Sequence, residues 1–238
     1  MDENTIAARI SIIQEKIESA CRTSGRKSSD IQLMAVTKSH PISMVEAAWK
    51  AGIRLFGENR VQEAGSKFRG FFEERASAKL HLIGSLQRNK AKAALALFDC
   101  IQSLDRDSLI DTLGDNPRDL TNTHENPLMV LLEYKTGEET KAGFSSLDDL
   151  IKAAEKVMRY PGLKLSGLMT VAPFSSDKTI QREAFRKLAC AKDELSKRFP
   201  AEDWSCISMG MSGDFETAIE EGSTMIRLGT ALFGERCV

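Results

Sequence analysis

The chain has 238 residues, of which 42% are hydrophobic and 28% charged, and its formal net charge is -1. This apolar content can fill a hydrophobic core, and the balanced charge gives no general attraction to nucleic acid or anionic lipid. The five cysteines lack CxxC spacing, which argues against a disulfide framework or a zinc site and favours a location in the cytoplasm. No apolar run approaches the roughly 18 residues of a membrane span.

Apolar residues recur at helical spacing in several segments. Ile6, Ile10 and Ile13 begin a stripe that predicts an amphipathic helix over residues 4–21. The same pattern predicts a second long helix over residues 177–199. Shorter helices are expected at residues 42–51, 59–75, 88–98, 106–113, 146–159 and 213–221.

Short apolar runs of strand length lie between these helices. They cover residues 31–36, 54–56, 80–83, 100–102, 128–133, 165–169, 206–208 and 225–228. Such alternation is typical of βα units around a parallel sheet. It predicts a (β/α)8 TIM-type barrel of the α/β class, a single domain over residues 1–238 with an extra helix at the N-terminus. The alternative is a doubly wound open sheet.

Lys38 directly follows the first predicted strand, in the segment AVTKSHP. In a barrel of this type the functional side chains lie where strands end and loops begin. A partly desolvated lysine amine at such a position loses its proton more readily and can form a Schiff base with a carbonyl compound. The alternative is a rim lysine whose ammonium extends into water.

Two polar residues follow or interrupt the next strands. Asn59 comes directly after the second strand, in FGENRVQE, either as a helix N-cap or as a polar group over the barrel mouth. His81 lies inside the third apolar run and shares a face with Ile83. That position is typical of a hydrogen-bonded core histidine, and a role at the mouth is the alternative.

The loops after the seventh and eighth strands have the composition of a phosphate site. Barrels often bind phosphate with these two loops, through backbone N–H groups and a helix N-terminus. Gly229 allows the backbone to approach an anion closely, while Ser212 and Thr230 offer hydroxyls. A turn glycine and a capping serine are the structural alternatives.

Arg227 alternates with Ile226 and Leu228 along the last strand, so either the guanidinium or the two apolar side chains face the barrel interior. An inward guanidinium needs a partner, because an unpaired buried charge is costly.

The chain has no HExxH motif, G-x-S-x-G elbow or GxxxxGK[ST] loop, so no metal site, serine-hydrolase site or P-loop is indicated.

Taken together, these motifs resemble the pyridoxal-phosphate homeostasis protein family, single-domain relatives of the alanine racemase barrel. The resemblance rests on AVTKSHP, FGENRVQE, HLIGSLQRNK, SGLMTVAPF, SMGMSGDFETAI and STMIRLGTALFGER, which occur in this order. It implies a type III fold for pyridoxal 5'-phosphate (PLP), in which Lys38 would be the Schiff-base lysine.

The resemblance also implies the rest of a cofactor site. Further matches are the phosphate ligands Ser208, Gly229 and Thr230, the pocket residues Asn59, His81, Met209 and Ser212, the pyridine-facing Arg227, and a second lysine, Lys141. Two positions depart from the family, which often has a lysine where this chain has His40 and a histidine where it has Gln102. Roles that relatives assign to those two positions are therefore not transferred.

The implied function is PLP binding without robust catalysis. An arginine can only donate to the pyridine nitrogen, which leaves the ring neutral and a poorer electron sink. Alanine racemase has a second domain that supplies a tyrosine base, whereas the barrel is expected to occupy this whole chain. We therefore expect a cytoplasmic, monomeric protein that stores, buffers or delivers PLP, with apo PLP-dependent enzymes as recipients and no catalytic residues.

Two other functions stay open. A PLP-dependent amino-acid racemase or lyase would need a proton-transfer group, for which His81, Lys141 and Tyr134 are candidates. A barrel that binds a sugar phosphate would use the phosphate loops alone, without PLP and without a Schiff-base lysine.

Overall fold

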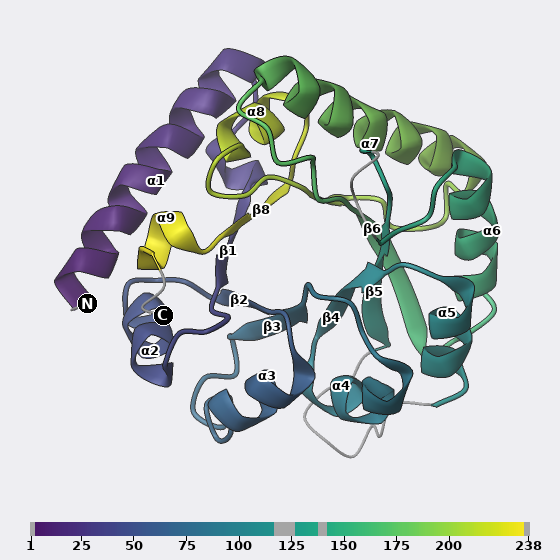
Figure 1. The fold of residues 1–238 in the computed structure, drawn as a ribbon, viewed down its shortest axis with the longest axis horizontal. Helices are drawn as coiled ribbons and strands as arrows, with labels where there is room; N and C mark the ends of the chain where they lie inside the picture. The colour runs from purple at the N-terminus through teal and green to yellow at the C-terminus, as the bar shows by residue number, and fades with distance from the viewer. Residues whose placement is uncertain (1–2, 117–126, 138–141, 236–238) are drawn as a thin grey trace.

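The computed structural model describes residues 3–116, 127–137 and 142–235. Eight strands close into a barrel in chain order, and helices surround it (Figure 1). The strands are β1 (Gln32–Val36), β2 (Leu55–Glu58), β3 (Lys79–Leu82), β4 (Cys100–Leu104), β5 (Leu128–Glu133), β6 (Leu163–Met169), β7 (Cys206–Ser208) and β8 (Met225–Leu228). Since β1 pairs in parallel with both β2 and β8, the predicted barrel is confirmed and the open sheet is wrong.

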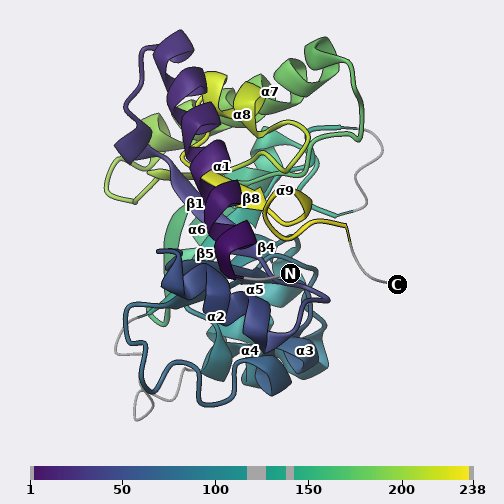
Figure 2. The same ribbon diagram turned by 90° about the vertical axis from the view of Figure 1, so that its left-hand side faces the viewer.

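The helices occupy the segments between the strands, with one extra helix at the N-terminus. They are α1 (Glu3–Ser24), α2 (Ile42–Lys50), α3 (Val61–Lys67), α4 (Ala91–Leu97), α5 (Asp107–Gly114), α6 (Leu147–Val157), α7 (Lys178–Arg198), α8 (Phe215–Glu220) and α9 (Thr230–Phe233). The extra helix α1 runs along the outside of the barrel against α2, α8 and α9 (Figure 2). Within the described ranges, no helix is long and apolar enough to cross a membrane.

The third helix is shorter than its sequence pattern predicts. We expected a helix over residues 59–75, but α3 ends at Lys67. Gly70 adopts a φ of 73°, a left-handed conformation that a continuing helix does not allow. Phe68 and Phe71 then fold back onto Phe56 of β2, with ring centroids 6.0 and 5.8 Å away. Aromatic packing against the barrel wall therefore replaces the last turns of the expected helix.

The apolar side chains form two separate layers. The larger layer fills the space between the barrel wall and the helices, and it includes the buried face of α1 and outward residues such as Ala35. A smaller cluster inside the barrel contains Cys100, Leu131 and Met169. This division follows from strand alternation, which sends successive side chains to opposite faces. Residue parity along each strand thus decides which side chains can reach the barrel interior.

Bulges in β4 and β6 interrupt that alternation. The pairing of β5 with β6 shifts register between Val130 and Leu132, so β6 carries an additional residue there. Gly167 lies in this stretch with a φ of 140°, and a Cβ on it would collide with the backbone oxygen of Cys206. Glycine is required here because the backbone conformation and the neighbouring strand leave no room for a side chain.

Candidate functional site

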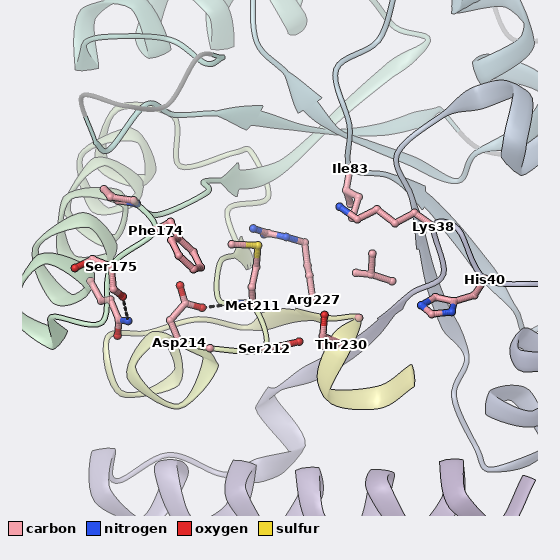
Figure 3. A pocket seen from close by; sticks show the side chains of 15 residues that line it. Lys38, His40, Ile83, Phe174, Ser175, Met211, Ser212, Asp214, Arg227 and Thr230 are labelled. Carbon is pink, nitrogen blue, oxygen red and sulfur yellow. Dashed lines mark hydrogen bonds between the residues drawn. The ribbon is translucent and has the colours of Figure 1, made fainter. Parts of the chain in front are cut away.

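A cavity of about 290 Å³ opens at the carboxyl ends of the strands (Figure 3). Residues that follow β1, β6, β7 and β8 form most of its wall. Five of the residues predicted to hold a cofactor line it together: Lys38, Ser212, Arg227, Gly229 and Thr230. The closed barrel brings these segments together, since its first and last strands are neighbours.

Lys38 enters the cavity from the loop after β1. Val36 lines the cavity and Thr37 is fully buried, so alternation returns the next side chain, that of Lys38, to the interior. Figure 3 shows Lys38 extending into the cavity from the wall that also carries His40. The His40 ring packs on Phe233 of α9 with centroids 4.9 Å apart, which fixes the loop beyond the lysine.

The adjoining wall is formed by the loops after β7 and β8. The backbone N–H of Ala231 donates to the Ser212 hydroxyl over 3.1 Å, which joins the two loops. A Cβ built on Gly229 would meet only Val36, at an ordinary contact distance of 3.5 Å. The protein's own packing therefore does not require glycine at this position. Hydroxyls, backbone amides and an open glycine surface form a donor set that suits a phosphate group.

The guanidinium of Arg227 faces the barrel interior at the base of this cavity and is only 4% exposed. It donates to the Ser208 hydroxyl and to the backbone oxygen of Thr170, both over 2.7 Å. Burial lowers the pKa of Arg227 to about 10, while the carboxylates of Asp214 and Glu133 act in the opposite direction. An arginine has only hydrogen-bond donors, so it suits a ligand acceptor such as an unprotonated ring nitrogen.

A chain of hydrogen bonds continues from Arg227 into the barrel. Ser208 accepts from Arg227 and donates to Gln102 Oε1 over 2.6 Å. This fixes the Gln102 amide nitrogen 2.9 Å from His81 Nδ1, which must then accept, so the proton of a neutral His81 resides on Nε2. Burial lowers the pKa of His81 to about 4, consistent with a neutral ring. Gln102, a departure from the family pattern, thus pairs with His81.

The remaining predicted residues lie elsewhere. Ser208 and His81 occupy deeper layers, Met209 is fully buried in the outer core, and half-buried Asn59 follows β2 with its backbone against Gly84. Asn59 is not an N-cap, since Arg60 precedes the first residue of α3. Lys141 falls outside the described residues. Direct cofactor contacts by these residues stay predictions.

Glu133 is a residue that our sequence analysis missed. It ends β5, is 9% exposed, and acts electrostatically on Arg227. Burial and the negative charge of Asp105 raise its pKa to about 7, and Arg227 partly opposes this shift. The signal was available, because Glu133 shares the parity of Leu131, which faces the barrel interior.

A second cavity, of about 440 Å³, opens at the amino ends of the strands. Its wall includes His81, Cys100, Cys206 and Met225. Burial raises the pKa of Cys206 to about 12, so its thiol is not a reactive thiolate near neutral pH. Among the described residues, no group of three or more histidine, cysteine or acidic side chains is arranged to hold a metal ion.

Comparison with known proteins identifies the family. The family model of the alanine racemase N-terminal domain matches residues 11–237. The pyridoxal phosphate homeostasis protein of Vibrio cholerae is 40% identical over 235 residues, which cover 98% of this chain and 97% of that protein. The chain belongs to the pyridoxal phosphate homeostasis protein family. Its namesake from Escherichia coli K12 is 38% identical over 235 residues, with the same coverage of 98% and 97%.

Solved structures agree with this assignment. The family member PipY of Synechococcus elongatus, determined with PLP bound, superposes with a TM-score of 0.80 at 31% identity, covering 96% of this chain and all of PipY. A protein of unknown function from Bifidobacterium adolescentis gives a TM-score of 0.86 at 33% identity, covering 98% and 97% of the two chains. Alanine racemase of Bacillus anthracis shares the fold, with a TM-score of 0.72 at 15% identity, and this chain covers 57% of it.

Proposed function

We propose that this protein binds PLP in the carboxyl-end cavity and serves cofactor homeostasis by storing, buffering or delivering it. The observation that carries the proposal is the placement of the Lys38 amine and a phosphate-binding donor set around one cavity (Figure 3). The PLP-bound structure of PipY, a relative of 31% identity, supports it. The residues therefore fit the group that the family name implies.

Each wall of the cavity has a distinct task in this proposal. Ser212, Thr230 and the backbone around Gly229 hold the phosphate. Arg227 would donate a hydrogen bond to the pyridine nitrogen, and Lys38 would supply the amine for covalent attachment through a Schiff base. When bound, PLP can serve as an electron sink, to a degree set by the protonation of its ring nitrogen.

The geometry supports a role without robust catalysis. Arg227 has no acceptor and cannot keep a proton on the ring nitrogen, so the ring stays a weak electron sink. Two of the candidate proton-transfer groups are not on the cavity wall: His81 lies below Gln102, and Tyr134 packs in the outer core. We extend the proposal to a monomeric, single-domain, cytoplasmic protein that hands PLP to apo PLP-dependent enzymes.

Absorption spectroscopy tests the binding site. Addition of PLP to the wild type is expected to produce the visible absorption of a protein-bound Schiff base, which Lys38→Ala abolishes. Lys16→Ala serves as the control, since Lys16 pairs with Glu216 on the surface, with its side chain 52% exposed. Equal absorption in wild type and Lys38→Ala would contradict the assignment of Lys38.

Two further measurements test homeostasis against catalysis. Incubation of the loaded protein with alanine in deuterated water is expected to give no rapid exchange of the α-proton, whereas rapid exchange would support the racemase alternative. Mixing the loaded protein with an apo PLP-dependent enzyme is expected to restore activity at least as fast as free PLP does. Complete retention of PLP would contradict a delivery role.

A further inference from the structure

A buried charged cluster lies behind Lys38, on the outer side of the barrel rim. Lys67, the last residue of α3, donates to Glu58 Oε1 of β2 over 2.7 Å and to Glu63 Oε1 over 2.9 Å. The side chain of Lys67 is 8% exposed and that of Glu58 is fully buried. Charged groups at such a position are costly unless they are paired, so a structural or functional reason for them is needed.

The cluster holds the residues on both sides of Lys38. Lys67 donates to the backbone oxygen of Thr37 over 2.7 Å, and the Thr37 hydroxyl donates to Glu58 Oε1 over 2.6 Å. On the other side, the backbone N–H of Ser39 donates to Glu63 Oε1 over 2.5 Å. The loop that carries Lys38 is therefore fixed before and after the lysine by side chains from β2 and α3.

The backbone of this loop is strained. Ser39 has a φ of 63°, and it is the one non-glycine residue with positive φ in the described part of the chain. A left-handed conformation is unfavourable for a serine and persists only where its surroundings hold it. The hydrogen bond to Glu63 and the one from the His40 N–H to the Thr37 oxygen, over 3.0 Å, hold this turn, beside which Lys38 extends into the cavity (Figure 3).

The charge state of Glu63 agrees with this role. Burial alone would raise the pKa of Glu63, but the hydrogen bonds from Lys67 and from the Ser39 backbone outweigh it and lower the pKa. Glu63 is thus an ionised acceptor for the Ser39 N–H at neutral pH, which makes that bond charge-assisted. Burial raises the pKa of Glu58, and Lys67 and Thr37 oppose this shift.

We propose that Lys67, Glu58 and Glu63 form a loop clamp that positions the Lys38 amine for covalent attachment of PLP. The proposal rests on the function proposed above. Attachment joins Nζ of the neutral Lys38 amine to the aldehyde carbon of PLP, and the aldehyde oxygen leaves as water with the two hydrogens of the amine. The clamp residues are positioning residues, because they act on Lys38 through Thr37 and Ser39. A clamped loop holds the amine in the reactive geometry before the cofactor arrives.

The test separates attachment from non-covalent binding. Pyridoxine 5'-phosphate has the ring and phosphate of PLP but no aldehyde, so it reports the phosphate loops and Arg227 alone. Lys67→Met is expected to slow Schiff-base formation on the order of tenfold to a hundredfold, while the Kd for pyridoxine 5'-phosphate stays within about twofold. Stopped-flow absorbance and equilibrium dialysis measure the two quantities.

Glu63 provides a second pair of variants that leaves the Lys67–Glu58 contact in place. Glu63→Leu removes the acceptor of the Ser39 N–H and is expected to slow attachment about tenfold. Glu63→Gln retains an acceptor oxygen and is expected to restore most of the rate. Lys50→Met is the matched control, since Lys50 pairs with Glu3 on the surface over 2.9 Å and its side chain is 62% exposed.

The outcomes are distinguishable. Attachment at the wild-type rate in both Lys67→Met and Glu63→Leu would overturn the clamp. A parallel loss of pyridoxine 5'-phosphate binding in those variants would also overturn it, by showing general damage to the site. Failure of the proposed function looks different, because the wild type itself would then form no Schiff base.

Discussion

The cavity at the amino end of the barrel, at about 440 Å³, is larger than the cavity that Lys38 lines at the carboxyl end, at about 290 Å³. The amino-end cavity has Cys100, Cys206 and Met225 on its inner wall and also Lys79 and Arg54, whereas the Lys38 cavity joins its amine and guanidinium with the backbone of the loops after β7 and β8. The amine of Lys79 pairs with Asp99 over 3.2 Å, and the guanidinium of Arg54 stacks on Trp49 with its carbon 3.8 Å from the ring centroid, so both cations of the amino-end cavity have partners outside the barrel interior. Cavity volume therefore does not locate the function of this barrel, while the chemistry at its strand ends does.

The hydrogen-bond chain from Arg227 to His81 joins the two ends. Arg227 lines the carboxyl-end cavity and His81 lines the amino-end cavity, with Ser208 and Gln102 between them. These hydrogen bonds fix the orientation of the buried Arg227 guanidinium from the amino-end side of the barrel. The amino end thus supports Arg227, at the carboxyl end, through hydrogen bonds.

The largest expected effect comes from removing that guanidinium. Arg227→Leu leaves the Thr170 oxygen without its donor and Glu133 without its nearby positive charge, and it should destabilise the fold by roughly 3–5 kcal/mol. We also expect the Kd for PLP to rise at least about tenfold. Urea unfolding and PLP titration measure these changes. Arg186→Leu is the control, since Arg186 is 63% exposed and should cost less than about 1 kcal/mol.

Substitution of Gly167 and of Gly229 distinguishes a glycine that the fold requires from one that the ligand requires. Gly167→Ala should cost roughly 2–4 kcal/mol, because its Cβ would collide with the Cys206 backbone at a φ of 140°. Gly229→Ala should change the unfolding free energy by less than about 1 kcal/mol, yet weaken PLP binding about tenfold by filling the phosphate approach. Equal stability losses in the two variants, measured by urea unfolding, would show that Gly229 is only structural.

Opposite pH dependences distinguish the two ends. Burial depresses the pKa of His81 to about 4 from 6.5, so its contribution to stability falls as pH drops from 6.5 to 4. Burial raises the pKa of Glu133 to about 7 from 4.5, so its contribution falls as pH rises from 4.5 to 7. Each change is on the order of 3 kcal/mol, at about 1.4 kcal/mol per pH unit.

Variants separate these two contributions. Relative to the wild type, His81→Gln should gain stability toward pH 4, and Glu133→Gln should gain stability toward pH 7. Urea midpoints measured at several pH values give both slopes. A pH-independent difference for either variant would mean that the residue titrates alike in the folded and unfolded states.

The smallest expected effect concerns the mouth of the carboxyl-end cavity. Phe174 lines it and is 102% exposed, so Phe174→Ser should change the unfolding free energy by less than about 0.5 kcal/mol. We expect PLP to dissociate up to about threefold faster, since the exposed ring lines the cavity and offers apolar surface to a bound ligand. Ile12→Ser on α1, where Ile12 is 55% exposed, should change neither quantity. A large stability loss in Phe174→Ser would show that the ring packs in solution.

The sequence predicts the barrel because its signals are local. Strand-length apolar runs bounded by helices sufficed, and the predicted ranges 128–133 and 225–228 match β5 and β8 at both ends. The overlong helix at 59–75 was wrong because the packing of Phe68 and Phe71 onto β2 is a tertiary effect. Such packing leaves no periodic trace in the sequence.

The sequence predicts which residues lie at the carboxyl ends of the strands. It predicts less well how far along the barrel axis an inward-facing side chain lies. Lys38, Gly229 and Thr230 lie within two residues of the ends of β1 and β8, and barrel closure brings them together. Ile83 lines the cavity, while His81, two positions earlier, lies one layer deeper. The clamp around Lys67 depends on how α3 packs on β2, which no spacing in the sequence reveals.

The central claim is the covalent bond between Lys38 and PLP. Borohydride reduction of the PLP-loaded protein converts a Schiff base into a stable secondary amine, and proteolysis followed by mass spectrometry locates it. We predict the added mass on the peptide that contains Lys38. The same mass on a different peptide, or on none, would contradict the account.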